Sequence, residues 1–477
     1  MKKSELKKLL VKKGSSIKET MRVIDGGRLG IAFIEDEDKK FFGLVTDGDI
    51  RRAILQGINI EKPIEEIVNK KPIVINEGFT EKEIKKLKES KEVKKRIPIT
   101  GSLKVPVLDK MGKIIDVVFI YADRKSALEL AAYKPKFLCD AIKRVLLTGG
   151  AGYLGSVLSR KLLSKGYKVR VLDNLTYGDE GIKELYKNKD FEFIKGDVRN
   201  ISEVIEALKG VDAVIHLAAI VGDSASQLDP KKTIEINYLS TKAVAEAAKF
   251  NQINKFLFAS TCSVYGTSRT PDDRLGEGSP LNPVSLYAET KLKSEEGILS
   301  LVDENFAPTI FRFATLYGVS PRMRFDLVIN ILTARALLEG KFSIFGGSQW
   351  RPFLEVSDAA RACLLWLESP IEKTGGEIFN VGVNEQNCQI LEIGKMVKKV
   401  IPEAKMEISK EKEDLRDYNV SFDKIIKTLR FRAKKTIEDG IKEMKNLIIA
   451  KKIRDFTQPK YNNYRFLLKN DKKPIFK

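Results

Sequence analysis

The sequence predicts an α/β protein built on a doubly wound parallel sheet, with a smaller α+β region before it. Three observations carry this prediction. Apolar strand-like segments alternate with amphipathic helix-like segments from residue 143 to about residue 455, as in a parallel sheet covered on both faces. A strand, a glycine turn and a helix start follow one another within Val145–Ser156. Before residue 132, two pairs of apolar strands recur instead.

The first 132 residues form the predicted α+β region. Segment 29–57 contains two apolar strands joined by a charged turn, followed by a helix that opens near Asp49. A second pair of strands, around a Met-Gly turn, occupies residues 105–120. The copies are roughly 70 residues apart, which is typical of a paired supersecondary unit rather than of a solenoid. A basic linker, 133–142, leads from here to the larger domain.

The larger domain, 143–455, opens on the glycine-rich turn. Gly149, Gly152 and Gly155 follow an apolar strand and precede an amphipathic helix at 156–166, and Tyr153 and Leu154 of the turn are candidate cofactor residues. The glycines allow a tight turn, a close approach of backbone N–H groups to a pyrophosphate, and close packing of the helix on the sheet. The helix N-terminus favours the same anion. This pattern predicts a Rossmann-type dinucleotide site.

The next strand ends in a carboxylate that indicates which dinucleotide is bound. Asp173, followed by Asn174, stands roughly 20 residues after the turn, where an acidic side chain accepts hydrogen bonds from the adenosine ribose. Its negative charge would repel a 2′-phosphate. The sequence therefore predicts NAD, and not NADP, as the cofactor.

The remaining chain continues the alternation and then departs from it. Further strands are predicted at 191–197, 213–219, 255–260 and 309–315. From about Pro321 the pattern loosens, so a small substrate lobe is expected mainly within 321–455. Residues 456–477 form a basic tail, which we expect to be a frayed terminus.

Composition narrows the class of protein. The chain has 477 residues, a net charge of +20, four cysteines and one histidine, so neither a metal site nor a disulfide framework is expected. The basic residues are interleaved with Glu, which favours a solvated surface over a nucleic-acid-binding face. No apolar run approaches the roughly 20 residues of a membrane span, and the first residues lack the apolar core of a signal peptide. We expect a cytoplasmic protein.

A tyrosine and a lysine four residues apart are candidate acid–base groups. Tyr287 and Lys291 lie on a strongly helical segment, so both project from one face. A phenol titrates at about 10 in water, and a neighbouring ammonium favours the phenolate. The spacing predicts that Lys291 lowers the pKa of Tyr287 to a useful range. Segment 255–266 contains a strand that ends in hydroxyl side chains at the sheet edge where ligands of such folds bind.

In this order, the segments TGGAGYLG, GDVRN, HLAA, STCSVYG, YAETK and RFATLYG resemble the extended short-chain dehydrogenases/reductases, above all their NAD-dependent nucleotide-sugar epimerases and dehydratases. The resemblance implies that Tyr287 is the catalytic acid/base. It implies that Lys291 is its partner and binds the nicotinamide ribose, and that Thr261 hydrogen-bonds the reacting sugar hydroxyl. Further cofactor contacts are implied for Ser260, Asp197, Val198, Ala218, Ala219 and Asn237. A homodimer is also expected.

Departures from the family pattern narrow the reaction. The dehydratases carry Asp-Glu after the catalytic Thr and the decarboxylases place a Glu in this segment, whereas Thr261 is followed by Cys262 and Ser263. The leading hypothesis is therefore a nucleotide-sugar 4-epimerase that oxidises the sugar 4-position transiently. An NAD(P)H-dependent 4-keto-sugar reductase and an NAD-sensing binding protein are the alternatives. His216, the single histidine, is expected to be a packing residue.

Arginines beyond the sheet are candidate ligands of a nucleotide diphosphate, because the planar guanidinium suits phosphate oxygens. By resemblance, Arg351 in SQWRPFLEVSDAARA clamps the phosphates and Asp358 is the structural carboxylate of that segment. Further candidate substrate residues are Arg322, Arg324, Arg416 and Thr315, the last where relatives commonly carry Asn. Surface salt bridging is the alternative for the additional arginines.

The two N-terminal copies resemble a tandem pair of CBS domains, nucleotide-sensing modules often fused to enzymes. The resemblance rests on GLVTDGDIRRAI, residues 43–54. It implies that Thr46 and Asp49 hold the ribose of an adenine- or cytosine-type nucleotide, or of a nucleotide sugar, and that this binding regulates the enzyme. Helix capping by Asp49 is the alternative. The second copy, GKIIDVVFIYAD, lacks the Thr, so at most one site is expected.

Overall fold

The computed structural model describes residues 6–27, 30–55, 57–90, 93, 102–121, 142–267, 274–303, 306–409, 416–450 and 453–470. The chain divides into two compact units, Met1–Leu130 and Ala131–Lys477. This division falls close to the expected end of the α+β region at residue 132. Apart from Ile142, the expected linker lies outside the described residues. In the described parts of the chain, no helix is long and apolar enough to cross a membrane.

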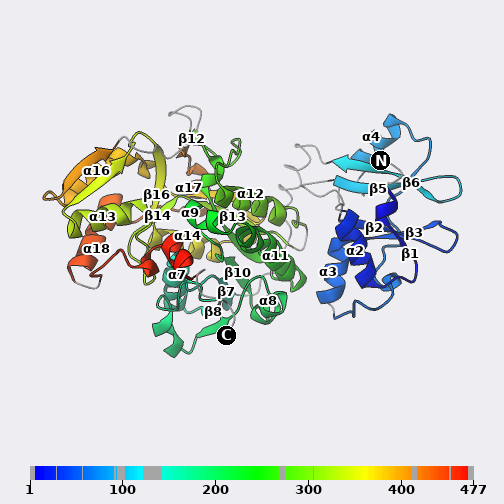
Figure 1. The fold of residues 1–477 in the computed structure, drawn as a ribbon, viewed down its shortest axis with the longest axis horizontal. Coiled ribbons are helices and arrows are strands. Elements are labelled where there is room, and N and C mark those ends of the chain that lie inside the picture. The colour runs from blue at the N-terminus through cyan, green and yellow to red at the C-terminus, as the bar shows by residue number, and fades with distance from the viewer. Residues whose placement is uncertain are drawn as a thin grey trace. The chain divides into compact units, whose positions relative to one another are not determined.

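Unit 1, drawn in blue and cyan in Figure 1, consists of two copies of one small motif. In each copy, one strand pairs in parallel with the first strand of an antiparallel hairpin. The first copy contains β1(Leu10–Lys12), α2(Ile17–Gly27), β2(Ile31–Glu35), β3(Phe41–Thr46) and α3(Asp47–Leu55). The second contains β4(Ile75–Asn76), α4(Glu81–Glu89), β5(Ser102–Leu108) and β6(Ile114–Tyr121). The two predicted strand pairs, β2–β3 and β5–β6, are thereby confirmed.

The two copies share a hydrophobic core. Phe33 and Leu44 of the first sheet are buried in one cluster with Ile114 and Val117 of the second. This shared burial joins the two copies into one compact unit.

Unit 2 is built on a seven-stranded sheet with the order β17-β13-β11-β10-β7-β8-β9, in which every neighbouring pair is parallel. The strands are β7(Arg144–Thr148), β8(Lys168–Asp173), β9(Phe191–Lys195), β10(Ala213–His216), β11(Lys255–Thr261), β13(Thr309–Phe313) and β17(Ile378–Val381). The chain runs outward from β7 to β9 and then returns to β10 on the other side of β7. The strand order therefore reverses between β7 and β10, where open α/β sheets bind ligands.

Helices cover both faces of this sheet. Leu147 and Val171 point to one face and pack on α7, α14 and α17, whereas their neighbours Leu146 and Leu172 point to the other and pack on α8, α11 and α12. The helices are α7(Tyr153–Ser164), α8(Ile201–Leu208), α11(Ser240–Phe250), α12(Leu286–Leu299), α14(Val356–Glu368) and α17(Asp423–Leu429). The predicted doubly wound parallel sheet is confirmed.

A smaller lobe follows β13 in the chain. It contains the sheet β14-β16-β18, the pair β15-β19 and three helices, and Figure 1 shows α13, α16 and α18 gathered at one end of unit 2. The elements are β14(Thr315–Tyr317), α13(Val328–Leu338), β15(Lys341–Phe345), β16(Trp350–Glu355), β18(Asn387–Gln389), α16(Ile390–Val400), β19(Lys405–Ser409) and α18(Ile437–Ile449). Buried Leu332, Ile344 and Ile393 form part of a core of its own.

The C-terminal segment differs from the frayed terminus expected from its charge. It forms η7(Pro459–Tyr461) and α19(Asn463–Asn470), and α19 packs against α9(Asp223–Leu228) of the sheet domain. Phe456 and Leu467 are buried. Apolar side chains that recur between the basic residues give the segment one apolar face, which its net charge conceals. Residues 471–477 lie outside the described part of the chain.

Candidate active site

A large cavity, of about 840 Å³, opens at the carboxyl ends of β7, β8, β10 and β11. With the exception of Asn237, every cofactor, catalytic and substrate residue predicted in unit 2 lines it. These residues are Gly149, Gly152, Tyr153, Leu154, Gly155, Asp173, Asn174, Asp197, Val198, Ala218, Ala219, Ser260, Thr261, Tyr287, Lys291, Thr315, Arg322, Arg324, Arg351 and Arg416. The sheet therefore brings together side chains that are far apart in the sequence.

The glycine turn brings backbone close to the cavity. Gly149 has φ +72°, and a Cβ at this position would lie 2.7 Å from the backbone of Ala218. A Cβ on Gly155 would lie 2.6 Å from the Cα of Gly150, so glycine alone lets α7 start this close to β7. The first residues of α7 line the cavity, and the unpaired N–H groups of a helix start suit an anion there.

Asp173 stands at the end of β8. Its Oδ2 accepts a hydrogen bond from the backbone N–H of Ala151 (3.0 Å), and its Oδ1 accepts one from that of Leu175 (2.8 Å). Burial raises the pKa of Asp173, against these two hydrogen bonds and the positive charge of Arg322. The backbone thus fixes a carboxylate at the place where a dinucleotide's adenosine ribose binds in this fold.

Asp197 and Asn174 form a second polar group, which lines the same cavity as Asp173. The amide of Asn174 donates to Asp197 Oδ2 (3.0 Å), and the guanidinium of Arg199 donates to the same oxygen (2.8 Å). Burial raises the pKa of Asp197, but the hydrogen bonds and charge of Arg199 and the Asn174 amide outweigh it and lower the pKa to about 2. Asp197 is therefore ionised at neutral pH.

The predicted acid–base pair lies on α12, beside the end of β11. Ser285 caps this helix, so Tyr287 and Lys291 occupy its first two turns. Lys291 Nζ donates a hydrogen bond to the carbonyl oxygen of Ala259 (2.7 Å) and lies 4.6 Å from the centre of the Phe258 ring. The lysine side chain is thus anchored to the strand that carries Thr261.

Burial shifts the pKa of both groups. Burial lowers the pKa of Lys291 to about 7, although the charge of Glu295 opposes this. Burial and the charge of Asp223 raise the pKa of Tyr287, whereas a hydrogen bond with Thr261 acts the other way. The spacing predicted a Tyr287 pKa lowered by Lys291, and here the structure differs. Desolvation favours the neutral phenol and the neutral amine alike, and the lysine is directed at a carbonyl of β11.

A buried ion pair joins α12 to β13, the strand next to β11, and it was not predicted from the sequence. Glu295 and Arg312 are joined by an ion pair of 2.7 Å, and each side chain is only 2% exposed. The hydroxyl of Ser260, which also lines the cavity, donates to Glu295. Glu295 stands one helical turn beyond Lys291 on α12, and this spacing is the feature of the sequence that points to it.

Asn237 holds a loop instead of lining the cavity. Its Oδ1 accepts from the backbone N–H of Ile220 (2.8 Å), and its Nδ2 donates to the Ile220 carbonyl (3.0 Å). Asn237 lies in η4(Glu235–Leu239), a single turn of π-helix, and is fully buried. Because the backbone of Ile220 uses both polar atoms of the amide, the structure does not bring Asn237 to the expected cofactor contact.

Two of the candidate arginines contact other side chains of the cavity, although the charge of Arg324 also opposes the rise that burial causes in the pKa of Tyr287. The guanidinium of Arg322 stacks 4.5 Å from the ring centre of Tyr177 and interacts with Asp173, and its Nε and Nη2 are buried without a hydrogen-bond partner. Burial lowers the pKa of Arg322 to about 10. Arg324 makes a bidentate ion pair with Asp326 (2.9 and 2.8 Å). Arg322 is therefore at the Asp173 end of the cavity, and Arg324 is held by a carboxylate.

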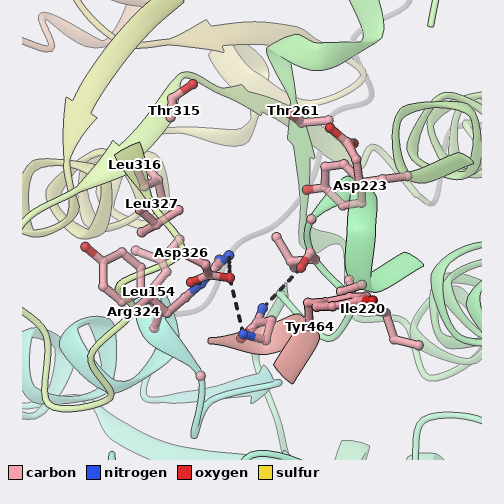
Figure 2. Close-up of a pocket in the computed structure, with 18 of the residues that line it drawn as sticks. Leu154, Ile220, Asp223, Thr261, Thr315, Leu316, Arg324, Asp326, Leu327 and Tyr464 are labelled. Atoms are coloured by element: carbon pink, nitrogen blue, oxygen red, sulfur yellow. Dashed lines mark hydrogen bonds and ion pairs between the residues drawn. The ribbon is translucent and has the colours of Figure 1, made fainter. Parts of the chain in front are cut away.

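The other two arginines contact Tyr418 and Asp223, two groups that act on the pKa of Tyr287. Arg351 stacks 5.1 Å from the ring centre of Tyr418, and Arg416 pairs with Asp223 (2.8 Å), which also accepts a hydrogen bond from Ser285 (2.7 Å). Figure 2 shows Asp223 and Thr261 on one side of the cavity, and Thr315 and Leu316 on the other. The sequence reasoning missed Asp223, because this carboxylate belongs to none of the motifs that carry the resemblance.

Two residues expected to be structural have that role. His216 is fully buried, with its ring nitrogens 2.7 and 2.9 Å from the hydroxyls of Thr148 and Thr241, and burial lowers its pKa to about 3. Asp358 accepts hydrogen bonds from the backbone of Lys434 and Lys435 (2.8 and 3.0 Å).

A doubly wound sheet with a glycine turn, a carboxylate at the end of the second strand and a Tyr–Lys pair at one edge is typical of a dinucleotide-dependent enzyme of Rossmann type. Comparison identifies the family more closely. The model of the NAD dependent epimerase/dehydratase family matches residues 145–382, and the chain belongs to this family. It is an NAD-dependent enzyme.

Relatives and solved structures agree with this family. An uncharacterized UDP-glucose epimerase of Bacillus subtilis is 32% identical over 54% of this chain and 82% of its own length. A UDP-N-acetyl-alpha-D-glucosaminuronate decarboxylase of Bacillus cytotoxicus is 32% identical over 51% of this chain and 76% of its own length. The UDP-glucuronic acid 4-epimerase of Bacillus cereus, solved with UDP-glucuronic acid and NAD, superposes with a TM-score of 0.56 at 29% identity over 64% of this chain and 99% of that one.

Proposed function

We propose that this enzyme is a nucleotide-sugar 4-epimerase. The observation that carries the proposal is the convergence of Thr261, Tyr287 and Lys291 on one cavity without a carboxylate directly after Thr261. Cys262 in that position is buried and donates to the Arg312 carbonyl, so it lies away from the ligand. The names of several relatives, which are UDP-glucose 4-epimerases, support the same reaction.

The residues present fit NAD, because the glycine turn leaves no room for a Cβ and Arg322 offers unpartnered donors beside Asp173. When bound, NAD would accept a hydride from the sugar 4-position and return it. Tyr287 takes the proton of the 4-hydroxyl and later gives it back. Thr261 holds that hydroxyl at hydrogen-bond distance. Lys291, in its ammonium form, stabilises the phenolate that Tyr287 needs as a base.

We assign the remaining predicted residues to two groups. Asp173 and Asn174 bind the adenosine ribose, Asp197 and Val198 meet the adenine, and the glycine turn with α7 holds the cofactor diphosphate. We place Arg322 with this group, because it interacts with Asp173. Substrate residues in this proposal are Thr315, Arg351 and Arg416, with the two arginines facing the nucleotide phosphates. Arg324, held by Asp326, is assigned to positioning.

The test is a panel of UDP-, dTDP-, GDP- and CDP-linked sugars incubated with purified protein, with products identified by NMR. The proposal expects inversion at carbon 4 of at least one substrate without added reductant. Conversion only with added NAD(P)H, loss of water or release of CO₂ would each contradict it. Tyr287→Phe protein serves as the matched control, because it keeps the ring but removes the proton carrier.

For unit 1 we propose a tandem CBS pair, residues 1–132, that binds one nucleotide at Thr46 and Asp49. Asp49 Oδ2 accepts hydrogen bonds from the Thr46 backbone N–H and hydroxyl (2.8 and 2.6 Å), and Thr46 Oγ1 accepts from the Asp49 N–H (3.2 Å). These reciprocal contacts cap α3, as the capping alternative expects. They also fix a hydroxyl and a carboxylate side by side at a strand-to-helix turn, an arrangement that suits a ribose diol.

A further inference from the structure

The C-terminal segment 453–470, which we call the clasp, is anchored first on the small lobe. Phe456 is buried in the cluster that contains Phe325, and the two rings meet edge to face at 5.9 Å. The Phe325 ring also meets that of Tyr461 at 5.5 Å, and its backbone N–H donates to the Tyr461 carbonyl (2.7 Å). These contacts hold the first half of the clasp beside α13 and α18.

The second half of the clasp packs on the cofactor-binding side of the sheet domain. Leu467 is 7% exposed and forms a buried cluster with Ile220, Ala225 and Ile236. The ring of Phe466 lies 5.5 Å from that of Tyr177, in the loop after β8. One continuous segment therefore binds both sides of the cavity.

Asn463 stands where the clasp crosses from one side to the other. Its backbone N–H donates to Asp326 Oδ2 (3.2 Å), and its Nδ2 donates to the carbonyl of Val221 (3.1 Å). Asn463 is 3% exposed. Figure 2 shows Tyr464 of the clasp between Arg324 and Asp326 on one side and Ile220 on the other. The bidentate pair of Arg324 with Asp326 keeps the acceptor for Asn463 in place.

The clasp covers the end of the cavity that holds the dinucleotide. Asn462, Asn463 and Tyr464 line the same cavity as Asp173. The Tyr177 ring contacts both Phe466 of the clasp and the guanidinium of Arg322, which in turn interacts with Asp173. Two ring contacts and one charge interaction thus link the clasp to the carboxylate expected to bind the adenosine ribose.

We propose that the clasp is part of the cofactor site and retains NAD between the two hydride transfers. The inference rests on the proposed epimerisation, in which the cofactor molecule reduced in the first transfer must still be present for the second. In this proposal, release of the cofactor requires the clasp contacts on both sides of the cavity to separate, so their loss speeds dissociation. The family match ends at residue 382, before the clasp begins.

The test compares full-length wild-type protein, the double variant Asn463→Ala/Phe466→Ala, the single variant Asn463→Ala, and Leu468→Ala, a control on the exposed side of α19. Each protein is saturated with NAD and desalted, and the release of NAD is followed without any sugar present. We expect release about tenfold faster from the double variant, from the loss of one buried hydrogen bond and one ring contact. The single variant should be intermediate, and the control should match wild type.

Release from the double variant at the wild-type rate, or equally fast release from Leu468→Ala, would overturn the proposal. The turnover of the double variant is also measured with saturating NAD. Turnover within about threefold of wild type under that condition supports the proposal, because the lost contacts then act on retention and not on chemistry. Failure of saturating NAD to restore turnover overturns it. Retention is measured without a sugar, so a protein that retains NAD through the clasp but epimerises nothing refutes only the proposed function.

Discussion

Burial governs the two titratable side chains at the centre of the proposed chemistry. Lys291 is 2% exposed and its pKa is lowered to about 7, while burial raises that of Tyr287. The amine is thus close to half protonated at neutral pH, where a small electrostatic change alters its charge. A bound diphosphate would therefore favour the ammonium form of Lys291, while Tyr287 stays a neutral phenol in the ligand-free protein.

Lys291 therefore makes the stability of the NAD-free protein depend on pH. Between about pH 7 and 10 the unfolded chain keeps a proton at Lys291 that the folded protein has released, so the free energy of unfolding rises with pH, by up to about 1.4 kcal/mol per unit. Lys291→Met removes this contribution, and the exposed Lys293→Met does not. Urea unfolding at a series of pH values measures it. A difference between wild type and Lys291→Met that does not change with pH would contradict the assigned shift.

Tyr287→Phe is expected to lower turnover by roughly 10²–10⁴-fold, the loss typical of a missing acid–base group. The ring remains, so NAD content should stay at the wild-type level. Tyr186→Phe, on an exposed ring outside the cavity, is the control. Steady-state kinetics with the substrate found in the panel, together with the NAD content of each protein, provides the measurement. Near-normal turnover in Tyr287→Phe would place the chemistry elsewhere.

At the scale of elements, the sequence predicted the features that local spacing determines, and it missed the features that depend on tertiary contacts. The glycine turn, the parallel strands and the pair on α12 have local spacing that determines their form, and they were predicted. Asn237 and the clasp did not follow from their own segments. The amide of Asn237 is used by a loop that lies 17 residues before it, and the partners of α19 lie on other elements of the sheet domain. Such pairings exist only once the sheet is assembled.

The glycine turn provides a prediction about one element. In Gly155→Ala the new Cβ meets the Cα of Gly150 at 2.6 Å, so α7 must move away from β7 and the N–H groups at its start lose their place. Overpacking of this kind costs about 1–3 kcal/mol, which as a loss of binding free energy raises the Kd for NAD roughly 5- to 150-fold. Gly276→Ala, where nothing lies within 4 Å, should bind NAD normally. Titration calorimetry with NAD measures both, and equal affinities would refute this role of the turn.

At the scale of the whole molecule, the chain joins a family enzyme to a second unit that the family match does not include. The match begins at residue 145, and unit 1 ends at Leu130. A nucleotide bound to unit 1 can change turnover only if it binds two states of the chain with different affinity. Regulation is therefore a separate question from binding, and binding has to be measured first.

Full-length protein saturated with NAD is expected to bind one nucleotide per chain outside the active site, at Thr46 and Asp49. Asp49→Ala removes the carboxylate that accepts two hydrogen bonds from Thr46 and pairs with Arg52, so it should abolish this binding. The control is Asp38→Ala in the exposed turn of the same unit, whose side chain is 79% exposed. Calorimetry with AMP, ATP, CMP and CTP tests this, and Asp49→Ala should leave turnover without nucleotide unchanged. If wild type and Asp49→Ala give the same heats up to millimolar nucleotide, the capping contacts are the whole role of this pair, and unit 1 is better assigned to a scaffold than to a sensor.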